Sequence, residues 1–200
     1  GLIGAWLGSL YFGMQSVLMP PLAFLARPER WLWAIHNHRA TLSAAPNFAY
    51  ELCLEKVADE RLEGLDLSTW RRAFNGAEPV SPRTVRRFAD RFVQFGFHPS
   101  AMAPVYGLAE AAVGLAFPPL GSGAVIDRVV RDVFEREGTA VPAEDTDDTA
   151  LEFVACGRPL PGSEVRIIGP TGRETGEREE GRLEFRGPSA TQGYLGNDEA

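Results

Sequence analysis

Apolar residues recur at helical spacing in one well-marked segment of the chain. Positions 85, 88, 89, 92 and 93 are all apolar, which is the stripe of a helix that packs against a core. Ser81 is a natural cap for this helix, Pro82 suits its first turn, and Gly96 can end it. The pattern therefore predicts a helix that begins at Pro82 and ends before Gly96.

Short apolar segments on both sides of this helix predict strands at residues 72–75 and 101–105, with a third at residues 40–43. Further helices are predicted from about Pro28, with Trp31, Leu32 and Ile35 on the inner face, and from about Phe48. Strands joined by a crossover helix run parallel. The predicted fold class is therefore α/β, a layered parallel sheet with flanking helices.

The pattern changes after residue 116. Residues 117–150 combine prolines, glycines, a short amphipathic piece and an acidic loop, which indicates a solvated insertion. From residue 153 apolar and polar residues alternate, as at Val165, Ile167, Leu183 and Phe185, and predict half-buried antiparallel strands joined by a charged hairpin over 169–181. We expect an α/β core over residues 1–116, an insertion on the same domain over 117–150, and the start of an antiparallel β subdomain over 151–200.

The first 26 residues carry no charged side chain. A membrane span is one interpretation, but four glycines, Gln15 and the Pro20-Pro21 pair argue against it, and no basic region precedes the run as in a signal peptide. The preferred interpretation is a buried helix from Gly1 to Phe12, ended by Gly13, and then a short buried strand at residues 16–19. So abrupt an apolar start also suggests a piece of a larger protein.

Charge and cysteine content narrow the functional classes. The chain has 20 basic and 27 acidic residues and a formal net charge of −7, which argues against nucleic acid as a partner because a phosphate backbone needs a basic face. Two cysteines are too few for a disulfide-stapled secreted scaffold, and no zinc-type spacing of Cys or His occurs. We therefore expect the protein in the reducing cytoplasm.

Two short segments place a glycine beside a carboxylate at the predicted ends of neighbouring strands: residues 75–79 (Asn-Gly-Ala-Glu-Pro) and residues 106–110 (Tyr-Gly-Leu-Ala-Glu). Open α/β sheets bind nucleotides at such positions. Gly76 would let the backbone approach a flat ring, Tyr106 could stack on a purine, and Glu110 could bind Mg²⁺ on a triphosphate. The alternatives are a turn that needs Gly and Pro for geometry alone and, for Glu110, an ordinary solvated glutamate.

Six segments, in order, resemble those of the adenylate-forming enzymes, and most closely the fatty acyl-AMP ligases. They are residues 1–4, 43–50, 75–79, 106–110, 157–162 and 187–194. Ala109 stands where many members of the superfamily have threonine, and in this the chain resembles the ligase subgroup. The resemblance implies an enzyme that uses ATP and Mg²⁺ to activate a fatty acid as acyl-AMP, releases pyrophosphate, and passes the acyl group to an acyl carrier protein.

The resemblance also assigns roles to individual residues. Glu110 would be the catalytic and metal-binding residue. The nucleotide would contact Asn75, Gly76, Ala77, Glu78, Pro79, Tyr106, Gly107, Leu108 and Ala109, and the acyl chain would contact Leu2, Ile3, Gly4, Pro46, Asn47 and Phe48. For the apolar residues among these, a plain core role is the alternative.

Two other functions stay open. An acyl-CoA synthetase would add a thioester step; by resemblance, the insertion at 117–150 is a feature of the ligases that restricts the small domain and disfavours CoA. A non-catalytic nucleotide- or acyl-binding module would lack the phosphate-binding loop and the catalytic lysine, which the family carries outside the segments found here.

Overall fold

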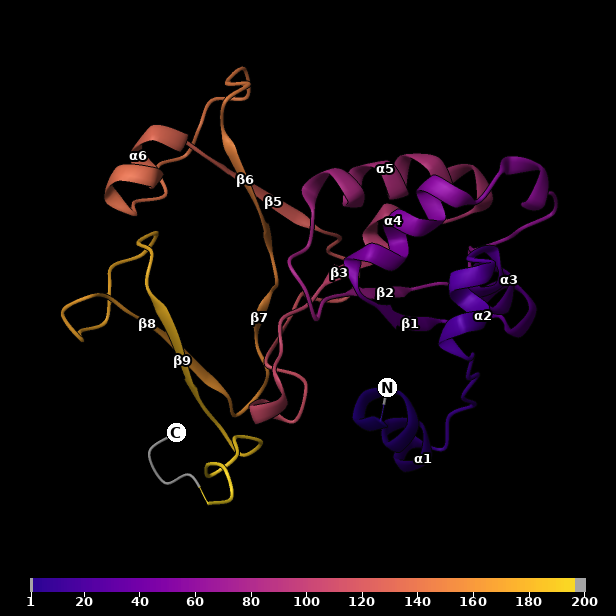
Figure 1. Cartoon of the computed structure of the whole chain (residues 1–200), viewed down its shortest axis with the longest axis horizontal. Coiled ribbons are helices and arrows are strands. Elements are labelled where there is room, and N and C mark those ends of the chain that lie inside the picture. The colour runs from indigo at the N-terminus through magenta and orange to yellow at the C-terminus, as the bar shows by residue number, and fades with distance from the viewer. Residues whose placement is uncertain (1, 197–200) are drawn as a thin grey trace.

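A parallel three-stranded sheet lies at the centre of the α/β part of the chain (Figure 1). The structure is a computed structural model that describes residues 2–196. Strands β1 (Leu42–Ala45), β2 (Arg72–Asn75) and β3 (Met102–Pro104) lie in the order β1-β2-β3, and both pairs are parallel. The predicted α/β class and parallel sheet are therefore confirmed.

Helices α3 (Glu29–His38), α4 (Asn47–Lys56) and α5 (Pro82–Phe92) pack on this sheet, with α4 and α5 side by side (Figure 1). The start of α5 is as predicted, because the Ser81 hydroxyl oxygen accepts a hydrogen bond from the Thr84 amide at 3.3 Å. The strand predicted at 40–43 begins later, since the Ala40 amide still belongs to the end of α3 and donates to the Ile35 carbonyl.

The core between sheet and helices is mainly aromatic. Tyr50, Trp70, Phe88 and Phe97 are almost fully buried, and their ring centroids lie 5.0 to 6.4 Å apart in edge-to-face and stacked pairs. Both polar ends are satisfied: the Tyr50 hydroxyl donates to the Phe74 carbonyl, and the Trp70 indole donates to the Arg72 carbonyl, each at 2.8 Å. These bonds tie α4 and the turn before β2 to the same central strand.

The N-terminal segment differs from its prediction. Residues Leu2–Leu7 form a π-helical stretch and α1 spans Gly8–Phe12, which ends at Gly13 as predicted, but neither element has a buried residue. The prediction of a buried helix is wrong within the described chain, because its large apolar side chains, such as Leu10 and Tyr11, are exposed. In Figure 1 this helix stands away from the sheet.

The strand predicted at residues 16–19 is also wrong: this stretch has no strand partner, and a further helix, α2 (Pro21–Ala26), follows it. Proline at a first helical position was the signal for α2. Across residues 2–196 no helix combines the length and the apolar character that crossing a membrane requires.

The rest of the described chain is built from antiparallel pairs. Short strands β4 (Ala116–Phe117) and β7 (Arg158–Pro159) pair, β5 (Val125–Val129) pairs with β6 (Leu151–Ala155), and β8 (Glu164–Ile168) pairs with β9 (Arg182–Arg186). Helix α6 (Arg131–Glu137) lies between β5 and β6. The predicted antiparallel segment is confirmed. The division at 116 and 150 stays a prediction, although β5 and β6 pair across its second boundary.

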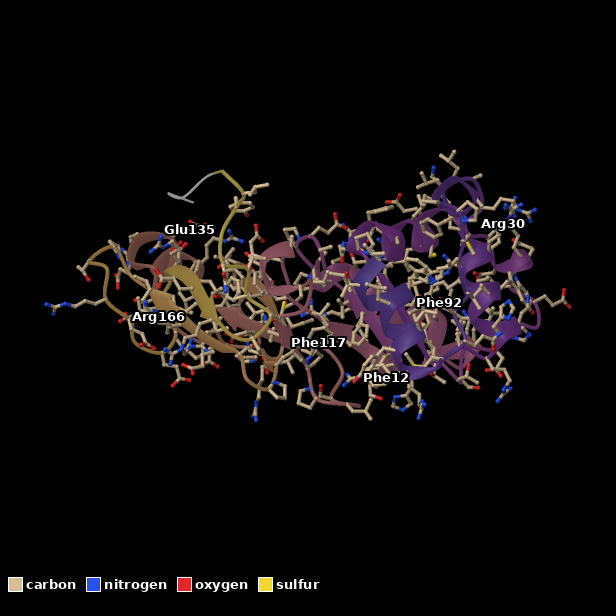
Figure 2. All side chains as sticks on the ribbon, turned by 90° about the horizontal axis from the view of Figure 1, so that it is seen from below. Phe12, Arg30, Phe92, Phe117, Glu135 and Arg166 are labelled. Atoms are coloured by element: carbon tan, nitrogen blue, oxygen red, sulfur yellow. The ribbon has the colours of Figure 1, made fainter. Side chains whose placement is uncertain are left out.

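These pairs extend away from the sheet. In Figure 2 Phe92 lies among the helices, Phe117 lies between the two parts, and Glu135 and Arg166 lie at the far end. An ion pair joins the parts, since the Arg86 guanidinium on α5 makes two hydrogen bonds, at 2.7 and 2.8 Å, to the Glu152 carboxylate on β6.

Candidate functional site

The carboxyl ends of the three parallel strands meet in one place. Ala45 pairs with Asn75, and Asn75 pairs with Pro104, so the strands end in register. Beyond that point the Gly76 amide donates to the Ala45 carbonyl at 3.4 Å and the Val105 amide donates to the Asn75 carbonyl at 2.8 Å. The structure thus brings together residues 46–48, 75–79 and 106–110, three of the segments that the sequence singles out.

Gly76 is required by the fold itself. A Cβ atom at this position would lie 2.7 Å from the Val105 carbonyl oxygen and 2.8 Å from its Cγ2, closer than real Cβ contacts. The glycine therefore lets the loops after β2 and β3 approach each other, whatever binds above them. Ala77, the next residue, has a positive φ of 67° and turns the chain outward.

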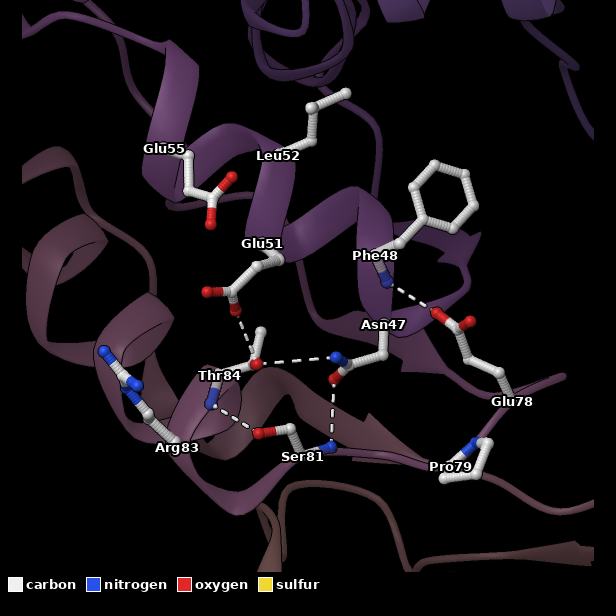
Figure 3. A pocket seen from close by; sticks show the side chains of 10 residues that line it. All are labelled: Asn47, Phe48, Glu51, Leu52, Glu55, Glu78, Pro79, Ser81, Arg83 and Thr84. Carbon is white, nitrogen blue, oxygen red and sulfur yellow. Dashed lines mark hydrogen bonds between the residues drawn. The ribbon is translucent and has the colours of Figure 1, made fainter.

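The Glu78 carboxylate points to helix α4. Its Oε1 accepts a hydrogen bond of 2.6 Å from the Phe48 amide, one of the free N–H groups of the first turn (Figure 3). The carboxylate is thus engaged within the protein, and the loop presents its backbone. Phe48 itself is 47% exposed.

Asn75 does not offer its side chain to the surface. The side chain is fully buried, and its Nδ2 donates to Asn47 Oδ1 at 3.2 Å. The same oxygen accepts from the Ser81 amide at 3.1 Å. Asn75 and Asn47, which the sequence assigns to different substrates, are therefore bonded to each other beneath the loops.

A pocket of about 520 Å³ opens between the first turns of α4 and α5 (Figure 3). It includes four predicted residues, and the others were missed. The full lining is Asn47, Phe48, Glu51, Leu52, Glu55, Glu78, Pro79, Ser81, Arg83 and Thr84. The spacing of 48, 51, 52 and 55, one face of a helix that starts at a predicted site residue, was the signal that could have found the α4 members.

Tyr106 begins a tight loop that returns to β4. Its amide donates to the Ala116 carbonyl at 3.0 Å, and its own carbonyl accepts from Leu115 and Ala116 at 3.0 and 2.9 Å. The backbone is thus fixed on both sides, while the residue is 40% exposed. The Tyr106 side chain thus projects from a fixed backbone and stays accessible, as stacking on a planar ligand requires.

Gly107 and Val113 close the same loop. A Cβ on Gly107 would lie 1.6 Å from the Val113 carbonyl oxygen, and Ala112 and Val113 have positive φ values of 48° and 80°. Positive φ in a β-branched residue is strained. Leu108, Ala109 and Glu110 lie between Gly107 and Val113 in the chain, so their placement depends on the close approach of these two residues.

Glu110 lies on a single 3₁₀ turn, Ala109–Ala111. Its Oε1 accepts a hydrogen bond from the Tyr194 hydroxyl, and its carbonyl accepts from the Thr191 amide at 2.8 Å. The Tyr194 hydroxyl lowers the pKa of Glu110 below its ordinary value, so the carboxylate is ionised at neutral pH. Tyr194 was not among the predicted site residues, because a separation of 84 residues gives no local signal.

The surroundings of Glu110 fit a divalent cation that takes one ligand from the protein and its other ligands from water and phosphate. No hydrogen bond to Glu110 Oε2 occurs within residues 2–196, and in that range no three acidic, His or Cys side chains form a metal-binding group. Mg²⁺ commonly keeps several waters and takes one or two carboxylates together with phosphate oxygens. Glu110 can supply such a single carboxylate.

Leu2, Ile3 and Gly4 lie apart from this site. Leu2 and Ile3 are 62% and 42% exposed, and a Cβ on Gly4 would meet no atom within 4 Å. Figure 1 shows their helix separated from α4 and the strand ends by the extended stretch before α2. The structure therefore brings Pro46, Asn47 and Phe48 to the loop at residues 75–79, but not residues 2–4.

Comparison with known proteins agrees with this arrangement. A family model described as AMP-binding enzyme matches residues 1–195. The chain belongs to this family. It is 38% identical, over 97% of its length, to the medium-chain-fatty-acid–[acyl-carrier-protein] ligase JamA of Moorena producens, of which it covers 33%. It is 35% identical, over its whole length, to a putative acyl-CoA synthetase of Caulobacter vibrioides, of which it covers 35%.

A solved structure of an AMP-binding relative shows the same fold. The fatty acyl-adenylate ligase from L. pneumophila, in complex with acyl adenylate and pyrophosphate, superimposes with a TM-score of 0.93 at 36% identity, over 100% of this chain and 35% of that one. The chain thus spans about a third of the length of the relatives it matches.

Proposed function

We propose that the protein containing this chain activates a fatty acid with ATP, forming acyl-AMP and releasing pyrophosphate. The observation that carries the proposal is the pair of loops, 76–79 and 106–110, at adjacent ends of parallel strands, with an exposed Tyr106 and an ionised Glu110. A carboxylate oxygen of the acid attacks the α-phosphorus of ATP, a P–O bond to that oxygen forms, and the bond to pyrophosphate breaks.

Each loop has a role in this proposal. The backbone of residues 76–79 follows the adenine edge, and the Tyr106 ring covers its face. Glu110 would hold Mg²⁺, which would supply positive charge to the phosphate oxygens. Pro46 and Phe48, beside Glu78, border the fatty acid, while Leu2, Ile3 and Gly4 remain proposed acyl contacts without support from the structure.

We further propose an acyl carrier protein as the acceptor, as in the name of the Moorena relative. The proposal rests on the insertion at 117–150, whose β5 and α6 are tied to β6 just beyond it, and β6 is held to α5 by Glu152 and Arg86. The Phe134 ring of α6 packs on Phe153 with ring centroids 5.2 Å apart, while Val125 is 57% exposed.

An acyl-CoA synthetase is the second candidate, and the similarity to the putative Caulobacter synthetase favours keeping it. A non-catalytic module is a third.

We place the protein in the cytoplasm, a proposal that two free cysteines, Cys53 and Cys156, support because a reducing compartment keeps thiols free.

The test is pyrophosphate release by the full-length protein with ATP and fatty acids of graded length, in wild type and in Glu110→Ala. We expect acid-dependent release in wild type and a loss of at least about 10²-fold in the variant, the scale of losing one electrostatic stabiliser of the transition state. Glu135→Ala is the matched control, because Glu135 is an exposed carboxylate on α6 paired with Arg131. Equal Mg²⁺ dependence and rate in Glu110→Ala and wild type would contradict the assignment of Glu110.

A further inference from the structure

A chain of hydrogen bonds joins β2, α4 and α5, and Figure 3 shows its part from Asn47 through Thr84 to Glu51. Asn75 Nδ2 donates to Asn47 Oδ1 at 3.2 Å, and Asn47 Nδ2 donates to Thr84 Oγ1 at 3.4 Å. The Thr84 hydroxyl in turn donates to Glu51 Oε2 at 2.6 Å. Arg87 fixes the far end of the chain, since its guanidinium donates to Glu51 Oε1 at 2.9 Å.

The direction of each bond follows from its neighbours. Asn47 Oδ1 accepts from the Ser81 amide, which can only donate, so the Asn47 NH₂ group must face Thr84. The Glu51 carboxylate accepts from Arg87 at one oxygen and from Thr84 at the other, so the single hydroxyl proton of Thr84 goes to Glu51 and the Thr84 oxygen lone pairs remain for Asn47. The Thr84 hydroxyl therefore accepts from Asn47 and donates to Glu51 at the same time.

The Thr84 hydroxyl is the buried link in this arrangement. Thr84 is 2% exposed, whereas Asn47 is half-buried and the Glu51 side chain is 29% exposed. Removing the Thr84 hydroxyl would take an acceptor from the Asn47 amide and a donor from Glu51 Oε2, and the two hydrogen bonds that join α4 to α5 through Thr84 would be lost. Relaxation would require the first turn of α4 to move relative to α5.

Such a movement would act on both proposed subsites at once. Asn47 begins α4 and sits next to Phe48, whose amide is held by Glu78 in the nucleotide loop. The exposed bond to Glu78 and the part-buried bonds of Asn47 thus fix residues 46–48 relative to residues 75–79.

We propose that Thr84 is a positioning residue that holds the fatty-acid segment, residues 46–48, in register with the nucleotide loop, residues 75–79. This inference rests on the proposed function, and it adds a residue that touches neither substrate. Because it sets the distance between two bound substrates and not the affinity for either, its loss should lower kcat more than it raises KM for ATP.

The experiment compares Thr84→Val, which removes only the hydroxyl, with Thr84→Ser, which keeps it, in the full-length protein. Thr69→Val is the matched control: Thr69 Oγ1 donates to the Ala40 carbonyl at 3.2 Å, at the opposite end of the same sheet. We measure kcat and KM for ATP and fatty acid, and hydrogen exchange of peptides that cover residues 46–52 and 76–82.

In Thr84→Val we expect kcat to fall about 10- to 100-fold, the scale of a small misplacement of reacting groups, with KM for ATP changed less than about threefold. Exchange should rise in both peptides. Thr84→Ser should restore most of kcat and the protection, and Thr69→Val should keep wild-type kcat.

An unchanged kcat in Thr84→Val, an equal fall in Thr69→Val, or exchange that rises in only one of the two peptides would overturn the proposal. If the wild-type protein forms no acyl-AMP at all, the proposed function fails instead. The exchange comparison needs no turnover, so it still decides whether the Thr84 hydroxyl holds the two segments together.

Discussion

Substituting Gly107 by alanine should break the loop that carries Glu110. The added Cβ would lie 1.6 Å from the Val113 carbonyl oxygen and 2.8 Å from its carbonyl carbon, and both are backbone atoms that cannot rotate away. A Cβ contact below 3.0 Å forces a shift, so the loop must open by at least about 1.4 Å, the difference between 3.0 and 1.6 Å. That opening pulls on the hydrogen bonds from Leu115 and Ala116 to the Tyr106 carbonyl.

Two further glycines show how the displacement forced by an added Cβ varies from site to site. At Gly76 the Cβ would lie 2.7 Å from the Val105 oxygen, so a shift of a few tenths of an ångström is enough. At Gly176 the nearest atom would be a Glu179 side-chain carbon at 3.4 Å, an ordinary contact. The three substitutions to alanine thus impose a large, a small and no displacement, with the same change in chemistry.

The assay is pyrophosphate release by the full-length variants, together with thermal denaturation. Because a misplacement of 1 Å can cost about 10²-fold, Gly107→Ala should lose at least that factor in kcat/KM. Gly76→Ala should fall between it and wild type, and Gly176→Ala should match wild type. Overpacking costs about 1–3 kcal/mol, so the first two variants should still fold. A folded Gly107→Ala with wild-type kcat/KM would refute the view that this closure places Glu110.

Other predictions concern single contacts. Tyr106→Ala should weaken ATP binding by about 1–3 kcal/mol, the value of one base–aromatic stack, whereas Tyr106→Phe should be much milder; equal losses in a binding titration would assign the role to the hydroxyl. Tyr194→Phe removes the hydrogen bond to Glu110 Oε1 and should raise the Mg²⁺ concentration for half-maximal rate, with unchanged Mg²⁺ dependence as the contrary result. Hydrogen bonding to Arg86 lowers the pKa of Glu152, so this tie between β6 and α5 is present at neutral pH and is lost as the pH falls through that lowered value. Glu152→Gln should reproduce the loosened state at neutral pH, seen as faster hydrogen exchange in β6, and should raise any acyl-CoA formation. This substitution leaves the pairing of β5 with β6 intact.

Local signals in the sequence predicted the elements that depend on local chemistry. The start of α5 depends on Ser81 and Pro82, which lie next to each other, and the structure has this start. The strand at 72–75 and the hairpin strands around Val165 and Phe185 also follow from short-range patterns. Where a cap, a turn or an alternation fixes the conformation, few residues suffice.

The predictions that failed concern burial, which depends on whether a second surface covers the segment. An apolar helix at residues 2–12 is predictable from composition, but its burial is a property of a second surface, and no described residue supplies one. The bonds of Asn75 to Asn47 and of Tyr194 to Glu110 span 28 and 84 positions. A single sequence carries no record of such pairs, because neither residue changes the local pattern around the other.

The glycines of the site show why a geometric and a functional interpretation need not exclude each other. Gly76 is required by Val105 and Gly107 by Val113, so both residues would be needed even if nothing bound above them. Close approach within the protein is also what brings the two loops near enough to share one ligand. What can serve a ligand is therefore what the closed loops leave accessible, namely the 40% exposed Tyr106 and the half-exposed Glu110. If the turn served geometry alone, Tyr106→Ala would not weaken ATP binding and Glu110→Ala would not change the Mg²⁺ dependence, so these two variants separate the two interpretations.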